Sequence, residues 1–165
     1  MTIIVKNKET LLFEDFQIKC SIGKRGVSIN KTEGDYATPK GFFSLGNIYY
    51  RADRLKKPIS KLNCIKITKN MGWCDDPKSK YYNKLIKIGK NLKTSYEKLF
   101  RKDHKYDLFL LIKYNYKKII KNKGSAIFLH LTKDYLPTKG CIALSKKDFL
   151  ILCKLIKKNT KIRIK

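Results

Sequence analysis

The residues best suited to chemistry lie in one short segment that begins at His130 and ends at Cys141. An apolar run over residues 126–129 precedes the histidine, and a second run over residues 142–144 follows the cysteine. If both runs are strands, the polar loop between them can bring an imidazole near a thiol. A thiol with a reference pKa of ~8.5 is largely protonated at neutral pH, so a cysteine nucleophile needs such a base. The pattern therefore favours covalent catalysis by a cysteine.

Gly140 precedes the cysteine and gives the backbone freedom for a tight turn. In such a turn, the amide N–H groups of Gly140 and Cys141 can face a developing oxyanion. The simpler alternative is that residues 137–140 form an ordinary hairpin turn and Cys141 is a core residue. Spacing alone leaves both interpretations open.

The elements that must hold these residues are mostly strands. Apolar alternation or continuous apolar runs predict strands over residues 3–5, 11–20, 41–50, 64–68, 106–114, 126–131, 141–144 and 161–165. The last of these is expected at the edge of a sheet.

Two helices complete the expected elements. Ser145 followed by Asp148 has the form of a capping box, and predicts a helix with Lys157 and Lys158 in its last turn. A second helix is expected over about residues 82–100. We therefore expect one domain over residues 1–165 that is mainly β, with one or two α-helices.

Composition describes a folded chain with an extreme charge. The apolar fraction of 42% and the aromatic fraction of 12% are typical of globular proteins. The net charge of +26 comes almost entirely from lysine, spread along the chain in singles and pairs. A nucleic-acid-binding module is the alternative that this charge suggests, but it predicts clustered cations with stacking aromatic residues. We therefore interpret the lysines as a solvated coat and expect no nucleic-acid partner.

The cysteines and the apolar runs exclude several other classes. None of the five cysteines shows C-x-x-C spacing, and Cys20, Cys64 and Cys153 lie in apolar surroundings typical of buried thiols. No apolar run approaches the ~18 residues that span a bilayer. The first residues lack the pattern of a signal peptide. We expect no metal site and no transmembrane segment.

The segment 130–141 resembles the active-site signature of the L,D-transpeptidase catalytic domain (YkuD-like) family, in which a histidine precedes a Ser/Thr-His-Gly-Cys sequence. Residues 37–43, Ala-Thr-Pro-Lys-Gly-Phe-Phe, resemble the family's Thr-Pro-x-Gly-x-Phe segment. Residues 72–77 and 125–130 resemble a short-loop branch of the same family. The resemblance implies a β-sandwich-like fold.

The resemblance also implies an activity. The family's cysteine attacks the carbonyl on the L-centre of diaminopimelate in a peptidoglycan stem peptide. Terminal D-alanine leaves, and the amine of a second stem peptide resolves the thioester as a cross-link. Water as the acceptor makes the same site an L,D-carboxypeptidase or another cysteine peptidase. By matching position, Cys141 is the nucleophile, His130 is the base, and Gly140, Thr138 and Lys139 bind substrate.

The resemblance implies no cofactor, and it implies peptidoglycan stem peptides as the partner. We expect the protein to be a monomer. It places the activity in the periplasm or cell envelope of a bacterium, although no signal peptide is visible in this chain. The sequence departs from the common signature at three positions. Lys139 replaces a second histidine, Ala143 replaces an arginine and Leu131 replaces a glycine. Without the arginine, Lys139 is the available cation for an acidic substrate group, as a point charge and not a bidentate fork.

Several other residues have a structural and a functional interpretation. We expect His104 to be a loop residue paired with a nearby carboxylate. Asp75 and Asp76 precede a proline and favour a turn, with reception of a substrate amine as the alternative. Trp73, Tyr81 and Tyr82 are expected in the core or at its rim, with the lining of a groove as the alternative. Arg25 and Arg51 are candidates for binding substrate carboxylates.

Overall fold

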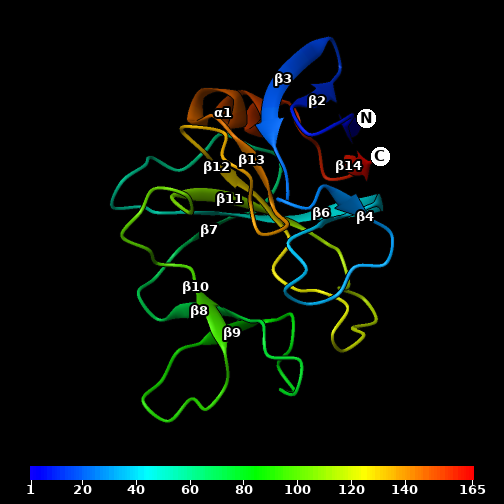
Figure 1. The fold of residues 1–165 in the computed structure, drawn as a ribbon. Helices are drawn as coiled ribbons and strands as arrows, with labels where there is room; N and C mark the ends of the chain where they lie inside the picture. Colours follow the sequence, from blue (N-terminus) through cyan, green and yellow to red (C-terminus); the bar gives the residue numbers. More distant parts are fainter.

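The computed structural model describes residues 1–165 and is built mainly from β-strands (Figure 1). The strands are β1 (Thr2–Val5), β2 (Thr10–Phe13), β3 (Phe16–Ser21), β4 (Val27–Ser28), β5 (Thr38–Pro39), β6 (Gly41–Tyr50), β7 (Cys64–Lys66), β8 (Met71–Cys74), β9 (Leu85–Lys87), β10 (Tyr96–Lys98), β11 (Leu108–Ile112), β12 (Phe128–Leu131), β13 (Ile142–Leu144) and β14 (Lys161–Ile164). The helix α1 spans Lys146–Leu155.

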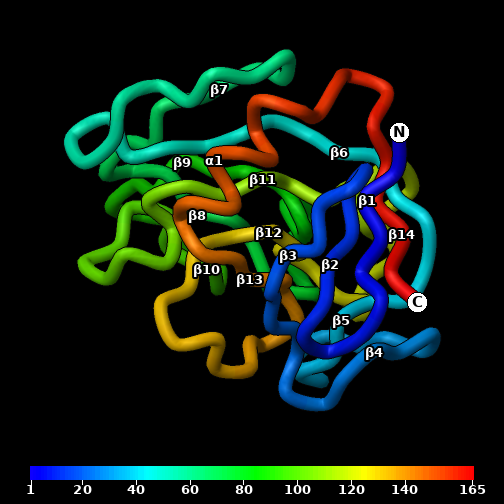
Figure 2. Tube along the Cα trace, turned by 90° about the horizontal axis from the view of Figure 1, so that it is seen from above, coloured from blue at the N-terminus to red at the C-terminus, as the bar shows by residue number.

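Nine strands form one sheet that closes on itself. Their order is β11-β12-β13-β3-β2-β1-β14-β6-β7, and β11 also pairs with β6. The long strand β6 makes this closure, because its first residues pair with β14 and its later residues pair with β11. The first and last strands, β1 and β14, lie side by side as a parallel pair, with the N-terminus at one end of the pair and the C-terminus at the other (Figure 2).

The inner face of this sheet holds the main core. Because side chains alternate along a strand, Leu108 and Leu110 of β11 point inward while Phe109 points outward. The inward residues form a cluster of 24 buried side chains, to which α1 contributes Phe149 and Leu152. This arrangement explains why every residue of β11, β12 and β13 is buried, since both of their faces are covered.

The outer face of β11 and β12 holds a second core of ten buried residues. A three-stranded sheet, ordered β10-β8-β9, supplies Trp73 to this cluster. Figure 1 shows this small sheet on the side of β11–β13 opposite to α1. The second core therefore lies between the closed sheet and the small sheet.

The helix follows β13 directly and begins as its sequence predicts. Ser145 is the N-cap, and its hydroxyl accepts a hydrogen bond from the Asp148 amide at 3.1 Å. The prediction that Lys157 and Lys158 lie in the last turn is wrong: the helix ends at Leu155, both lysines follow it, and Lys154 is the basic residue of the last turn. The only helix has 10 residues, and no helix is long and apolar enough to cross a membrane.

Three predictions about elements are wrong. Residues 82–100 form no helix; they contain β9 and β10, which pair with β8. The run over 11–20 is part of a hairpin of β2 and β3, because Glu14 adopts a left-handed turn with φ of 49°. Strand β14 lies inside the sheet between β1 and β6, and not at an edge. The mainly β, sandwich-like prediction itself is confirmed, with one helix.

Candidate active site

Cys141 and His130 lie on the same outer face of two neighbouring strands. His130 of β12 is opposite Ala143 of β13, and Leu129 is opposite Ile142 in the same parallel register. Cys141 is two residues before Ala143, so it shares the face of Ala143 and His130. The imidazole and the thiol therefore occupy diagonal positions on one surface of the sheet. The sequence predicts two strands flanking the loop, and this placement depends on them.

The loop between β12 and β13 is anchored beside the cysteine by Thr138. The Thr138 hydroxyl donates to the Cys141 carbonyl at 2.6 Å and accepts from the Gly140 amide at 3.1 Å. The Thr138 backbone pairs with Ile22 and Lys24 at the end of β3, with both N···O distances at 2.9 Å. Thr138 thus acts as a clamp on the turn that presents the thiol.

Gly140 is required at its position. Its φ is +135°, and an added Cβ would lie 2.8 Å from the Ala37 carbonyl oxygen. Its amide is engaged with Thr138, whereas the Cys141 amide donates to no other group of the chain. Of the two predicted oxyanion donors, the Cys141 amide is the one without an acceptor.

The segment 37–43 lies directly against this turn. The Thr38 hydroxyl accepts from the Gly23 amide at 2.8 Å, and Gly23 pairs with Thr138 in an isolated bridge. Ala37 and Thr38 are buried. The fold therefore brings together two sequence motifs that are about 100 residues apart, which is what the resemblance requires.

The Cys141 thiol is nearly enclosed, with 8% of the residue exposed. Its sulfur donates to the Ala126 carbonyl at 3.2 Å and accepts from the Phe128 amide at 3.3 Å. Burial and the negative charge of Glu97 raise the pKa of this thiol to about 12. The resting residue is therefore a thiol and not a thiolate.

The His130 imidazole is also buried and is held in one tautomer. Its Nδ1 lies 2.9 Å from the Leu131 carbonyl oxygen, which can only accept, so Nδ1 carries the hydrogen. Burial lowers the pKa of His130 to about 4, which keeps the ring neutral. Nε2 is then the unprotonated nitrogen, in the state that a general base needs.

Tyr106 packs beside His130, and the sequence did not identify it as a site residue. Its ring meets the His130 ring edge-on, with centroids 5.4 Å apart, and it belongs to the same buried cluster as Cys141. His130 and Cys141 make no hydrogen bond with each other; each is bonded to the backbone. The proton transfer between them stays a prediction.

Two charged residues missed by the sequence analysis complete this side of the site. Glu97 of β10 accepts a hydrogen bond from the Tyr106 hydroxyl at 2.6 Å. Arg101 lies 3.6 Å from the same Glu97 oxygen. Lys31 is a third omission: its buried ammonium pairs with Asp35 and lowers the pKa of Cys141. Only the pairing of distant strands reveals these residues, so no sequence signal pointed to them.

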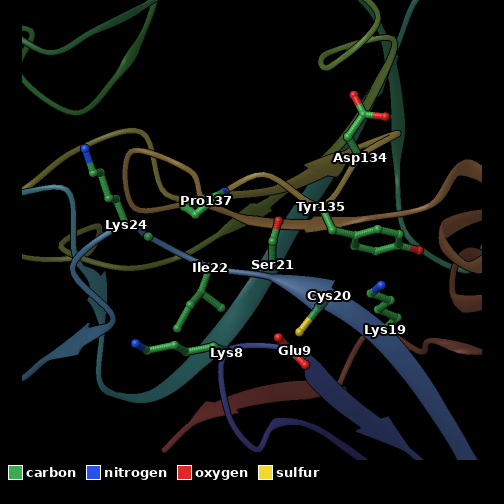
Figure 3. A pocket seen from close by; sticks show the side chains of 11 residues that line it. Lys8, Glu9, Lys19, Cys20, Ser21, Ile22, Lys24, Asp134, Tyr135 and Pro137 are labelled. Atoms are coloured by element: carbon green, nitrogen blue, oxygen red, sulfur yellow. The ribbon is translucent and has the colours of Figure 1, made fainter.

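A hollow of about 320 Å³ lies beside the site, along the end of β3 (Figure 3). Its lining consists of Lys8, Glu9, Lys19, Cys20, Ser21, Ile22, Gly23, Lys24, Asp134, Tyr135 and Pro137. Ser21 is opposite Ala143 in register, and its buried hydroxyl has no hydrogen-bond partner. Ser21 thus connects the hollow to Ala143, while Cys141 and His130 do not line it.

The predicted substrate residues differ in their exposure. Lys139 is exposed, and its charge lowers the pKa of Glu97. Thr138 is half-buried and Gly140 is buried. Ala143 leaves no cation in the row, as the sequence indicates.

The other candidates have structural roles. His104 pairs with Asp107 at 2.7 Å, which confirms the loop interpretation. Asp76 caps a turn through the Lys78 amide at 2.9 Å.

The aromatic and arginine candidates divide between the core and the surface. Trp73 and Tyr82 are core residues, while Tyr81 and Arg25 are exposed. Arg51 is buried against Asp53.

The five cysteines are all free, and Cys64 is half-buried where we expected burial. Cys20 and Cys153 are buried as predicted. No group of three or more His, Cys, Asp or Glu side chains could hold a metal ion.

Comparison with known proteins agrees with this geometry. The family model for the L,D-transpeptidase catalytic domain, YkuD, matches residues 1–164 of the chain. No curated protein sequence matches closely enough to count as a relative. The match covers the closed sheet, the small sheet and the turn that carries Cys141. This chain therefore belongs to the L,D-transpeptidase catalytic domain family.

Proposed function

We propose that the protein is an L,D-transpeptidase that cross-links peptidoglycan stem peptides through a thioester on Cys141. The observation that supports this most directly is the placement of Cys141 and His130 on one face, next to a turn clamped by Thr138. The family match over residues 1–164 supplies the substrate class.

In the proposed reaction, His130 Nε2 takes the proton of the Cys141 thiol as the sulfur attacks the donor carbonyl. The bond from Nδ1 to the Leu131 carbonyl keeps the ring oriented and helps to stabilise the imidazolium that forms. The imidazolium then gives its proton to the departing amine of D-alanine. The resulting thioester is resolved by the amine of a second stem peptide.

The free Cys141 amide is the proposed donor to the oxyanion of the tetrahedral intermediate. The donor peptide is proposed to reach the site along the hollow beside β3. Lys19 and Lys24 line that hollow, and Lys139 stands at the turn. These lysines are candidates for the substrate carboxylate that an arginine holds in other members of the family.

The test is acylation of Cys141. A carbapenem added to the wild-type protein should give a mass increase that maps to the Cys141 peptide, because this drug class acylates cysteines of the family. Cys141→Ala should give no adduct, and His130→Asn should form it much more slowly. Cys153→Ala is the matched control, because it removes another buried thiol, in the inner core and away from the hollow, and should leave the adduct unchanged. Equal adducts on wild type and Cys141→Ala contradict the proposal.

Incubating the protein with purified muropeptides and analysing the products shows whether an amine or water resolves the thioester. A cross-linked dimer supports transpeptidation. A shortened monomer without a dimer identifies an L,D-carboxypeptidase that uses the same residues with water as the acceptor.

A further inference from the structure

Tyr106 connects the candidate nucleophile to a carboxylate that faces solvent. The residue itself is 4% exposed and packs in the cluster that contains Cys141. Its hydroxyl donates to Glu97 Oε1 at 2.6 Å, and its ring contacts His130. Glu97 keeps 30% of its side chain exposed, so its charge can respond to the surroundings.

The charges around Glu97 leave its carboxylate incompletely neutralised. Arg101 is 3.6 Å away, but its closer partner is Asp103 at 2.6 Å. Asp75 adds a second negative charge, and Lys139 adds a positive one. Burial has the largest influence on Glu97. It raises the pKa of the carboxyl group, and so favours the neutral form of Glu97.

The hydroxyl of Tyr106 has one proton and can donate it to only one acceptor. While that proton is directed to Glu97, it is not available to the sulfur. A thiolate at Cys141 has the Phe128 amide as its donor and needs further donors in this buried position. The bond to Glu97 therefore competes with ionisation of the nucleophile.

We propose that Tyr106 and Glu97 form a switch that sets the ionisation of Cys141, with Glu97 acting as a positioning residue through the Tyr106 hydroxyl. With Glu97 ionised, the hydroxyl is held by the carboxylate and Cys141 remains a thiol. When Glu97 takes a proton from solvent, its O–H donates to the Tyr106 oxygen, and the Tyr106 hydroxyl turns to the sulfur. The thiol proton itself still passes to His130, so the inference rests on the proposed function.

The charge of Glu97 and its hydrogen bond to Tyr106 both favour the thiol form of Cys141. An ionised Glu97 raises the pKa of Cys141, while the Tyr106 hydroxyl and Lys31 lower the pKa of the same thiol. Neutralising Glu97 removes the opposing charge and frees the donor. The gain from neutralising Glu97 should therefore depend on the Tyr106 hydroxyl, which a purely structural role of either residue does not require.

The test is the rate of Cys141 alkylation by iodoacetamide, measured by peptide mass spectrometry at a series of pH values. Glu97→Gln should raise the rate at neutral pH about tenfold, because loss of the like charge and release of the Tyr106 hydroxyl to the sulfur together lower the pKa of Cys141 by about one unit. Tyr106→Phe alone should change the rate by less than about threefold, because in wild type the hydroxyl is held by ionised Glu97 and is not donated to the sulfur. In the Tyr106→Phe background, Glu97→Gln should give less than half of its tenfold gain.

A rate that is unchanged or lower in Glu97→Gln overturns the switch, as does a full tenfold gain in the double variant. Tyr82→Phe is the matched control, because it removes a hydroxyl bonded to Glu33 in a buried tyrosine outside the Cys141 cluster. Its Cys141 rate should equal that of wild type. Glu97 is partly exposed, so Glu97→Gln should remain folded, which circular dichroism checks; the direction of its effect decides the question even if Tyr106→Phe unfolds.

Alkylation needs no peptidoglycan, so this test is separate from the proposed function. The switch fails if Glu97→Gln leaves Cys141 alkylation unchanged, even where carbapenem acylates the wild type. Conversely, a carbapenem adduct that persists in Cys141→Ala removes the proposed function while the alkylation result stands.

Discussion

Cys141 and His130 are both held neutral by the same physical cause. Burial raises the pKa of the thiol to about 12 and lowers the pKa of the imidazole to about 4. Creating a thiolate and an imidazolium here separates charge in a poorly solvated space, so each ion needs the other and its backbone partners. The resting site therefore holds a thiol and a neutral imidazole, and a thiolate forms only when its charge gains additional donors.

Gly140→Ala is the residue-scale test of the turn that presents Cys141. The new Cβ would lie 2.8 Å from the Ala37 carbonyl oxygen, and φ of +135° is unfavourable for alanine. We expect a loss of about 2 kcal/mol or more in unfolding free energy from urea denaturation, together with loss of Cys141 acylation.

Gly34→Ala is the matched control for this change. Gly34 also has a positive φ, of +74°, but a Cβ there meets no atom within 4 Å. It should lose about 1 kcal/mol from backbone strain alone and keep Cys141 acylation. Equal losses of stability and activity in the two variants would show that contact with Ala37 is unimportant.

At the scale of elements, the start of α1 fixes the end of β13. Ser145 follows Leu144 directly, and its hydroxyl both accepts from the Asp148 amide and donates to the Asp148 carboxylate at 2.6 Å. Ser145→Ala should reduce the unfolding free energy by about 1 kcal/mol in urea denaturation. Ser79→Ala removes a similar bond, to the Tyr81 amide in an exposed turn, and should change stability by less than ~0.5 kcal/mol. A smaller effect at Ser145 than at Ser79 contradicts the capping role.

The elements that could be predicted from sequence are those with a local cause. The Ser145 cap and the strands over 41–50 and 142–144 follow from side-chain chemistry and apolar pattern. Strands β9 and β10 have three residues each and lie between polar loops, so their strand conformation comes from pairing with β8. The apolar pattern within each short strand does not indicate this pairing. For that reason the sequence predicts a helix over residues 82–100.

The candidate site divides in the same way. His130 and Cys141 are close in the chain, so their common loop made them visible together. Tyr106 was read as the start of an apolar strand, and Glu97 fell inside the expected helix. They meet because β10 pairs with β8 over the outer face of β11 and β12. A carboxylate and a phenol joined by tertiary structure carry no local signature.

For the whole molecule, the charge of +26 is compatible with a folded chain because the cations are placed in water. Of all the lysines, only Lys31 is buried, and it is paired with Asp35. The remaining lysines are exposed or half-exposed and occur on every part of the fold. This distribution agrees with the solvated coat expected from the sequence. Such a field raises the local concentration of acidic ligands without defining a single binding face.

The stability of the whole molecule should fall in acid because of His130. The folded pKa of about 4 lies below the reference value of 6.5, so the unfolded chain binds the extra proton between these pH values. The contribution of the neutral ring is complete above pH 6.5 and is lost as the pH falls toward about 4. That loss amounts to about 3 kcal/mol, at 1.36 kcal/mol per unit.

Denaturant unfolding at a series of pH values measures this loss. His130→Asn should flatten the wild-type slope between pH 6.5 and about 4, whatever its stability at neutral pH. His104→Asn is the control, because that side chain is 62% exposed and its removal should preserve the slope. If His130→Asn retains the full slope, the acid sensitivity belongs to carboxylates such as Asp35, whose ion pair with Lys31 also breaks on protonation. The buried neutral imidazole would then not be the group that limits folding in acid.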